Sequence, residues 1–448
     1  MIRTLDSRDE RAIAALLDRS PARNPDVERA AGAIVADVRA RGDAAVREYA
    51  VRFDGLDGGF EVTRAEMRRE ARQVPAAVRR AIREAARHIR HVAARQVPRG
   101  WRTTPVPGVA IEQRVTPLDR VGCYVPGGRY PLPSSLLMTA IPARVAGVRD
   151  VIVVCPKPDP TVMAAALDAG VTRLFRLGGA QAIAALAYGT ASVPRVDKVV
   201  GPGNAYVAAA KALVSTDCAI DFFAGPTEIL IVSSTGRPDW IAADLIAQAE
   251  HDEDARAVFV TPNRRLAGAV AAEVTARTPA GGPARAALAR HGAIVVARTP
   301  AEAIALANRM APEHVVCDSA GVAARLTRAG TVFVGAFSAQ AAGDYVTGSN
   351  HVLPTSGAAR ARGGLSAADF VRVATVQTVT RAGIRRIAPH GVALATAEGL
   401  AAHAESMRLR LQTTRASAAS EPRDRSAPAK RRARARVEES EGRSPSGN

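Results

Sequence analysis

Two residues able to bind a metal ion, Gln248 and His251, stand three positions apart in the segment 240–251. Apolar residues such as Ile241 and Leu245 recur there at helical spacing, which predicts an amphipathic helix. The carbonyl oxygen of Gln248 and the imidazole of His251 would then face the same side, an arrangement that can seat a metal ion. The alternative is that the two side chains simply cap the end of the helix.

A carboxylate and an imidazole are adjacent in Pro312-Glu313-His314, between an expected helix and an expected strand. Adjacent side chains point in different directions, so the two could serve different steps of one reaction. Glu313 could deprotonate a water molecule, and His314 could take a proton from an alcohol.

A polar, glycine-rich segment, 338–364, carries Asp344 and His351. Long irregular segments of this kind in compact enzymes usually serve function. Together with the pair on the expected helix, these residues form a nitrogen and oxygen ligand set suited to zinc or a similar divalent ion. His403, with Glu398 five residues before it, offers one more imidazole. For each histidine taken singly, a hydrogen-bonded structural role is the alternative.

The segments around these residues alternate between strand and helix patterns. From about residue 125 to 230 the order is strand, turn and helix, repeated, and a second such pattern follows from 228 to 334. This alternation is typical of α/β units with a parallel sheet, so the sequence predicts two similar nucleotide-fold-like halves. Their strands are expected at 151–155, 173–177, 198–200, 228–232, 257–261, 293–296, 315–316 and 331–334. Helices are expected at 25–51, 75–96 and 370–407, and two further strands at 109–115 and 120–125.

Glycine-rich turns follow two of these strands, at Gly178-Gly179-Ala180-Gln181 and Gly201-Pro202-Gly203-Asn204. Backbone N–H groups and helix N-termini at such turns can approach a phosphate closely, which suggests a dinucleotide ligand. The usual GxGxxG fingerprint with an acidic residue about 20 positions later is absent from the sequence. The alternative is that both are simply tight turns.

The composition narrows the possible classes of protein. A chain of 448 residues with 47% apolar residues is long enough for two or more domains with proper cores. The net charge of +18 is spread along the chain and could attract phosphate-bearing ligands. No basic patch interleaved with aromatic residues occurs, so no nucleic-acid partner is expected. No apolar signal segment and no membrane-spanning apolar run occur, so no membrane association is expected.

The cysteines and the C-terminal segment point to no further site. Cys123, Cys155, Cys218 and Cys317 are far apart and lack CxxC spacing, so neither a zinc ribbon nor a disulfide framework is expected. Isolated cysteines of this kind fit a reducing cytoplasm. Residues 413–448 hold nine Lys or Arg against five Asp or Glu, without apolar periodicity, which indicates a disordered basic tail. The alternative is a tail that binds an acidic partner.

Taken together, these motifs resemble those of the histidinol dehydrogenase family, from about residue 5 to residue 412. The matching blocks are YVPGG (124–128), GGAQA (178–182), GPGN (201–204), AGPTE (224–228), QAEH (248–251), PEH (312–314), GDY (343–345), NHVLP (350–354) and EGLAAH (398–403). So many blocks in the same order make a chance similarity negligible.

The resemblance implies an α/β fold with two incomplete Rossmann-like, parallel-sheet domains and small helical N- and C-terminal extensions, in a domain-swapped homodimer. The missing glycine fingerprint is then expected, because this family binds NAD on incomplete nucleotide folds. The implied divisions are a helical extension at 1–24, a first domain with the metal and catalytic residues at 25–123 and 229–365, an NAD-binding domain at 124–228, a C-terminal helical domain contacting the partner subunit at 366–412, and the tail at 413–448.

The resemblance also implies the ligands of the site. Zinc, one ion per subunit, would be bound by Gln248, His251, Asp344 and His403, with His403 supplied by the partner subunit. NAD would be bound by Tyr124, Gln181 and Asn204. The substrate, L-histidinol, would contact Thr227, His314, His351, Glu398 and the four metal ligands, with Glu398 also contributed across the interface.

The implied reaction is a pair of NAD-dependent oxidations, from L-histidinol through L-histidinal to L-histidine, the last steps of histidine biosynthesis. His314 would be the general base in both hydride transfers, and Glu313 would activate the water between them. Thr227 stands where the family more often has serine, which keeps the hydroxyl group.

Two competing functions stay open. The segment 122–130 is also similar to paralogues that oxidise other small polar alcohols, such as sulfonated diols. Glu398 and His403 favour histidinol, because a carboxylate suits a cationic substrate and repels a sulfonate. A non-catalytic binding scaffold is the other alternative, and the retained Glu313, His314 and metal-ligand positions count against it.

Overall fold

The computed structural model describes residues 2–18, 24–127, 130–223 and 225–412. The chain forms two compact units, Met1–Gly100 with Arg114–Ala374 and Trp101–Gln113 with Thr375–Asn448. The expected tail at 413–448 lies outside the described residues. No helix in the described part of the chain is long and apolar enough to cross a membrane.

The first unit contains two six-stranded sheets, and the first of them is parallel throughout, in the order β1-β12-β11-β10-β13-β14. Its strands are β1 (Arg3–Asp6), β10 (Glu228–Val232), β11 (Arg256–Thr261), β12 (Ala293–Val296), β13 (His314–Cys317) and β14 (Thr331–Val334). Its helices are α1 (Glu10–Leu17), α10 (Pro238–Ala249), α11 (Arg264–Arg277), α12 (Pro283–Arg290), α13 (Pro300–Met310), α14 (Ala320–Ala323) and α15 (Gln340–Tyr345).

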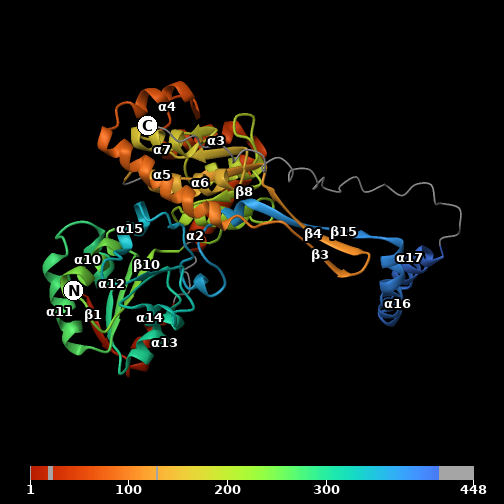
Figure 1. The fold of residues 1–448 in the computed structure, drawn as a ribbon. Helices are drawn as coiled ribbons and strands as arrows, with labels where there is room; N and C mark the ends of the chain where they lie inside the picture. Colours follow the sequence, from red (N-terminus) through yellow and green to blue (C-terminus); the bar gives the residue numbers. More distant parts are fainter. Residues whose placement is uncertain (1, 19–23, 128–129, 224, 413–448) are drawn as a thin grey trace, which may run out of the picture. The chain divides into compact units, whose positions relative to one another are not determined.

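Both faces of this sheet are covered by helices (Figure 1). Ile229 and Ile231 of β10 pack in a core with α10, α11 and α12, whereas Leu230 and Val232 pack in a second core with α1 and α13. Successive side chains of a strand point to opposite faces, so a strand buried on both faces needs an unbroken apolar run. The run in β10 meets that requirement.

The described residues near the N-terminus, 2–18, pack with this sheet. Strand β1 pairs in parallel with β12, residue for residue from Arg3 opposite Ala293. In α1, Ile13 and Leu16 are buried in the core that also contains Leu230. The expected N-terminal helix is present as α1, whereas strand β1 before it was not predicted, because a four-residue strand gives little periodic signal.

The second sheet has the order β2-β7-β6-β5-β8-β9 and is parallel except for β2. Its strands are β2 (Glu61–Val62), β5 (Arg120–Tyr124), β6 (Asp150–Val154), β7 (Arg173–Phe175), β8 (Lys198–Val200) and β9 (Ala219–Ile220). The helices that accompany it are α2 (Pro25–Arg41), α3 (Asp43–Tyr49), α4 (Arg64–Ala71), α5 (Ala76–Gln96), α6 (Pro133–Val145), α7 (Pro160–Ala169), α8 (Gly179–Tyr188) and α9 (Ala205–Val214), with a π-helix at Ala50–Asp54.

Residues 25–123 pack with this second sheet, whereas the resemblance had grouped them with 229–365. Ile89 of α5 lies in a core with Leu137 of α6, and Val35 of α2 lies in a core with Ile183 of α8. The apolar sides of α2 and α5 therefore cover the two faces of the second sheet. A helix's own periodicity shows which side is apolar but not which sheet it covers.

The second unit consists of strand segments and a helical hairpin. A three-stranded sheet has the order β15-β4-β3, with β3 (Trp101–Val106), β4 (Val109–Pro117) and β15 (Val371–Val379). The helices α16 (Arg381–Ala397) and α17 (Ala401–Leu411) pack against each other. The expected helix at 370–407 is therefore wrong in its first part, where β-branched residues recur and favour a strand. Short 3₁₀-helices occur in the first unit at Ala358–Arg360 and Ala367–Phe370.

Candidate functional site

The candidate catalytic residues lie at the amino-terminal edge of the first sheet. Strand β10 pairs with β13 so that Ile229 is opposite His314, which brings the start of both strands to one edge. Helix α10 follows β10 and returns the chain to the edge of the sheet where β10 began. The next strand, β11, starts at that edge, where the backbone N–H of Arg256 donates to the carbonyl of Thr227. Gln248, near the C-terminus of α10, therefore reaches the same edge. His251 lies two residues beyond the helix end, not on the helix as expected.

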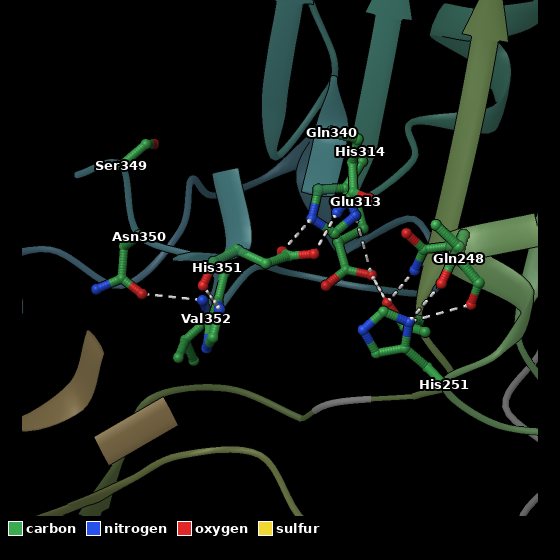
Figure 2. A network of polar contacts seen from close by, with 12 residues as sticks. Gln248, His251, Glu313, His314, Gln340, Ser349, Asn350, His351 and Val352 are labelled. Carbon is green, nitrogen blue, oxygen red and sulfur yellow. Dashed lines mark hydrogen bonds and ion pairs between the residues drawn. The ribbon is translucent and has the colours of Figure 1, made fainter. Parts of the chain in front are cut away.

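A chain of hydrogen bonds joins a candidate metal ligand to a candidate base. Gln248 Nε2 donates to Thr227 Oγ1 over 2.5 Å, and Thr227 Oγ1 donates to Glu313 Oε2 over 2.6 Å. The backbone N–H of Glu228 donates to the same Glu313 oxygen over 2.8 Å. Figure 2 shows Gln248 and His251 lying beside Glu313 and His314. These hydrogen bonds hold Oε2 of Glu313 in place, so its other oxygen is the one that could meet a ligand.

Glu313 is almost completely buried, at 6% exposure. Burial raises the pKa of its carboxyl to about 8, because the charged form loses water; the hydrogen bonds from Thr227 and Glu228 oppose that rise. Its carboxylate form is a stronger base than an exposed one, but below about pH 8 the metal-free site holds this group mostly protonated, so it must lose that proton before it can accept one from water.

His314 is oriented as a base by its backbone partner. Its Nδ1 lies 3.1 Å from the carbonyl oxygen of Glu228, which can only accept, so Nδ1 donates and Nε2 carries the lone pair. Nε2 lies 3.8 Å from Asp344 Oδ1. Burial lowers the pKa of the imidazole, while Asp344 and the Glu228 carbonyl oppose the decrease and His251 adds to it. A neutral imidazole with a free Nε2 can accept a proton from an alcohol.

Asp344 is held at both its side chain and its backbone. Its Oδ2 accepts a hydrogen bond from Gln340 Nε2 over 2.8 Å, within helix α15. Its carbonyl oxygen accepts from His351 Nδ1 over 2.9 Å, and burial lowers the pKa of His351. The other ring nitrogen, His351 Nε2, lies 3.5 Å from Ser135 Oγ of α6.

The exposed imidazole of His251 is also oriented by the backbone. Its Nδ1 lies 3.1 Å from the carbonyl oxygen of Ala247, so Nδ1 donates and Nε2 has the lone pair with which it could bind a metal ion. His251 is near enough to both His314 and His351 to lower their pKa values. The site thus gathers three imidazoles around Asp344 and Glu313.

The amide oxygen of Gln248 provides a test of whether a metal ion fits. Gln248 is fully buried, and its Oε1 has no hydrogen-bond partner among the described residues. A buried acceptor without a partner is costly unless a ligand satisfies it. No group of three or more His, Cys, Asp or Glu side chains that could hold a metal ion is present in the described part of the chain. The amide oxygen, with His251 and Asp344, supplies a mixed oxygen and nitrogen set that suits zinc and needs a further ligand.

Glu398 and His403 belong to the second compact unit. Glu398 is the residue that ends α16, and His403 lies in the first turn of α17. Both side chains are exposed in the single chain. Their role in the site stays a prediction.

The candidate NAD residues lie at the carboxyl-terminal edge of the second sheet. Tyr124 ends β5, Gln181 lies in the first turn of the helix after β7, and Asn204 caps the helix after β8. This is the edge where nucleotides bind to open parallel sheets. The phenol and the two amides are uncharged groups of the kind that hydrogen-bond a dinucleotide. Tyr124 and Gln181 are buried here, and each already has a hydrogen-bond partner within the protein.

The first glycine-rich turn differs from the expected phosphate site. The backbone N–H of Gly178 donates to Asp54 Oδ2 over 2.9 Å, and that of Gly179 donates to the hydroxyl of Tyr124 over 3.2 Å. Gln181 Nε2 also donates to Asp54 Oδ2, over 3.1 Å. Both backbone N–H groups therefore already have partners within the protein, and the buried carboxylate of Asp54 beside them would repel a phosphate.

The second glycine-rich turn is clamped by a buried ion pair. Asp221 Oδ2 accepts from the backbone N–H of Gly201 over 2.8 Å, and Lys211 Nζ donates to the carbonyl of Gly201 over 3.0 Å. Lys211 and Asp221 also pair with each other, with side chains only 3% and 1% exposed. Gly201 has a φ of +114°, and a methyl group there would collide with the carbonyl oxygen of Tyr124.

Sequence reasoning missed several residues of these sites. Asp54, Lys211 and Asp221 belong to no motif, and their partners are distant in the sequence. Glu228 was part of a matching block, and its buried carboxylate accepts from the backbone N–H of Ser356 over 2.8 Å. Gln340 stands four residues before Asp344, so helical spacing could have revealed that pair.

Comparisons with known proteins agree on one family. The family model described as histidinol dehydrogenase matches residues 17–411. The chain is 46% identical over 415 residues to the histidinol dehydrogenase of Cereibacter sphaeroides, covering 90% of this chain and 96% of that protein. It is 44% identical over 427 residues to the histidinol dehydrogenase of Geobacter sulfurreducens, covering 91% and 100%. Among solved structures, histidinol dehydrogenase from Elizabethkingia anophelis matches with a TM-score of 0.87 and 32% identity, covering 92% of this chain and 98% of that one.

Proposed function

The chain belongs to the histidinol dehydrogenase family, and from that premise we propose that it oxidises L-histidinol through L-histidinal to L-histidine, with NAD and one zinc ion per subunit. These two successive oxidations are the last steps of histidine biosynthesis. The buried, unpaired cysteines accord with the cytoplasmic location predicted from the sequence.

Gln248, His251 and Asp344 would hold the zinc ion from one chain, with His403 of the partner subunit as the fourth ligand. When bound, zinc would hold the substrate's nitrogen atoms, and NAD would accept the hydride from its carbinol carbon. Glu398 of the partner subunit would attract the cationic substrate. Tyr124, Gln181 and Asn204 would hold the cofactor.

His314 would take one proton in each oxidation. In the first, the alcohol O–H gives its proton to His314 Nε2 while the carbinol carbon loses a hydride, which leaves the aldehyde. The donor bond from Nδ1 to the Glu228 carbonyl keeps Nε2 free for this task. The proton must then leave to water before the second oxidation.

Glu313 would act between the two oxidations. A water molecule adds its oxygen to the aldehyde carbon and gives one proton to Glu313, while the former carbonyl oxygen takes up a proton from solvent, which produces the hydrated aldehyde; Glu313 then releases its proton to solvent. His314 then takes a proton from one hydroxyl of the hydrate as the second hydride leaves, which yields the carboxylic acid. Two bases in one site explain how one enzyme can carry an alcohol to an acid.

The observation that carries this proposal is the contact of Glu313 with Thr227 and of Thr227 with Gln248, because it links a candidate base to a buried oxygen suited to a metal ion. The test is to supply the purified protein with L-histidinol, NAD and zinc and to count NADH formed per histidinol consumed. Two equivalents are expected. One equivalent with accumulating aldehyde would refute the role of Glu313, and none would assign the protein to a paralogue that oxidises another small polar alcohol.

A further inference from the structure

A second glutamine, Gln340, is buried beside the candidate metal ligand Asp344. It is 1% exposed and opens helix α15, one helical turn before Asp344. Its Nε2 donates to Asp344 Oδ2 over 2.8 Å. Its Oε1 has no hydrogen-bond partner among the described residues. No matching block of the sequence includes Gln340.

The orientation of this amide follows from electrostatics. If the amide were turned over, its oxygen would face a carboxylate oxygen, and two acceptors would repel each other. The nitrogen must therefore face Asp344, and the oxygen is left without a partner. The bond to a charged acceptor is of the stronger, charge-assisted kind.

The bond also decides which Asp344 oxygen remains available. Oδ2 is occupied by Gln340, whereas Oδ1 faces His314 Nε2 at 3.8 Å. The backbone carbonyl of Asp344 is held separately by His351. Gln340 is thus the side chain that sets the rotation of the carboxylate.

We propose that Gln340 is a positioning residue that turns Asp344 so that Oδ1 meets the metal ion; this rests on the proposed zinc site. Groups that hydrogen-bond a metal ligand from behind fix its direction and strengthen metal binding. A residue kept for the fold alone would not retain an unpaired buried oxygen, because that oxygen opposes folding.

The two roles predict opposite changes when Gln340 becomes apolar. Gln340→Met keeps the length of the side chain and removes both the bond to Asp344 and the unpaired oxygen. For a positioning role, zinc affinity falls by about 10- to 100-fold, while the melting temperature of the metal-free protein changes little, because the lost bond to Asp344 and the removed unpaired oxygen act in opposite directions. For a structural role, the melting temperature falls and zinc affinity of the folded protein is unchanged.

The experiment titrates zinc against a chromophoric chelator in the full-length protein and records thermal unfolding after metal removal. Gln96→Met is the matched control, because Gln96 is a partly buried glutamine of α5 whose amide oxygen accepts from the backbone N–H of Ala367. Gln340→Leu repeats the measurement with a second apolar side chain. Whether the wild type binds zinc tests the proposed function. The ratio of the variant's zinc affinity to that of the wild type tests the role of Gln340. An affinity within about threefold of the wild type for both variants, or a fall in affinity matched by a fall in metal-free stability, overturns the proposal.

Discussion

The hydroxyl oxygen of Thr227 lies 2.5 Å from Gln248 Nε2 and, on its other side, 2.6 Å from Glu313 Oε2. A hydroxyl group has one hydrogen to donate. Because Thr227 gives that hydrogen to Glu313, it can only accept from Gln248, so the amide nitrogen must face it. The Gln248 oxygen is thereby directed away from Thr227. It has no hydrogen-bond partner among the described residues and could bind a metal ion.

The first prediction concerns this hydroxyl group. Thr227→Val keeps the shape of the side chain but removes the acceptor that holds the Gln248 amide. We expect zinc affinity to fall by about 10- to 100-fold, whereas Thr227→Ser, which keeps the hydroxyl, stays near the wild type. Chelator competition measures both variants. Thr261→Val is the control, because Thr261, although more buried than Thr227, ends β11 at the opposite edge of the sheet. If Thr227→Val binds zinc normally and only the KM for histidinol rises, then Thr227 contacts the substrate alone.

The second prediction separates the two bases. Glu313→Gln keeps an oxygen that can accept from Thr227 and from the Glu228 N–H, so the fold is expected to survive. The variant cannot take a proton from water, and the second oxidation should slow by about 10²- to 10⁴-fold with the first largely spared. Single-turnover formation of NADH from histidinol and from the aldehyde distinguishes the steps. An equal decrease in the rates of both oxidations would show that Glu313 and His314 do not act in separate steps.

The third prediction concerns stability and pH. The pKa of Glu313 is raised from 4.5 to about 8 by burial, so the folded state binds this proton more tightly than the unfolded state does. Its favourable contribution is complete below about pH 4.5 and is lost as the pH rises to about 8. In metal-free protein, the stability of Glu313→Gln relative to the wild type should increase by a few kcal/mol, in order of magnitude, between about pH 5 and pH 9. Denaturant unfolding at several pH values measures this difference, and a constant difference would contradict the raised pKa.

These sites show what local sequence patterns can and cannot predict. Nine of the twelve strands in the two six-stranded sheets were predicted within two residues of their observed ends, because strands covered on both faces need apolar runs. The short strands β1, β2 and β9 were not predicted. Glu313 and His314 were recognisable in the sequence as an adjacent carboxylate and imidazole whose side chains point in different directions. In the structure His314 begins β13 and Glu313 is the residue before it. The helix that carries Gln248 was also confirmed, whereas the helix expected over 371–379 was wrong.

The rest depends on contacts between distant residues. Nothing in the spacing around Glu313 shows that Thr227, 86 positions away, donates to it. The same holds for Asp54, which meets Gly178 across 124 positions. The sequence likewise shows that α2 and α5 are amphipathic but not that they cover the second sheet. Such pairings are set by the packing of whole elements, which one sequence does not reveal.

The fourth prediction concerns the clamp on Gly201. Lys211→Met leaves Asp221 buried without its cation, which should cost about 3–5 kcal/mol of stability. Because both residues hold the Gly201 turn next to Tyr124, the KM for NAD should rise while zinc affinity is unchanged. Arg277→Met is the control, since its pair with Glu273 is exposed and contributes about 1 kcal/mol or less. Lower stability with an unchanged KM for NAD would limit the clamp to a structural role.

The last prediction tests whether each site is shared between two subunits. In the proposed arrangement, His251→Asn would remove a ligand from a chain's own site, and His403→Asn would remove the ligand that the chain gives to its partner. In a mixed dimer both defects fall on one site, and the other site receives an intact His251 and an intact His403. Co-expressed chains purified through two different tags should therefore regain about half the wild-type activity per dimer, although each variant alone is inactive. If each chain used its own His403, both sites of the mixed dimer would carry a defect, and no NADH formation would return.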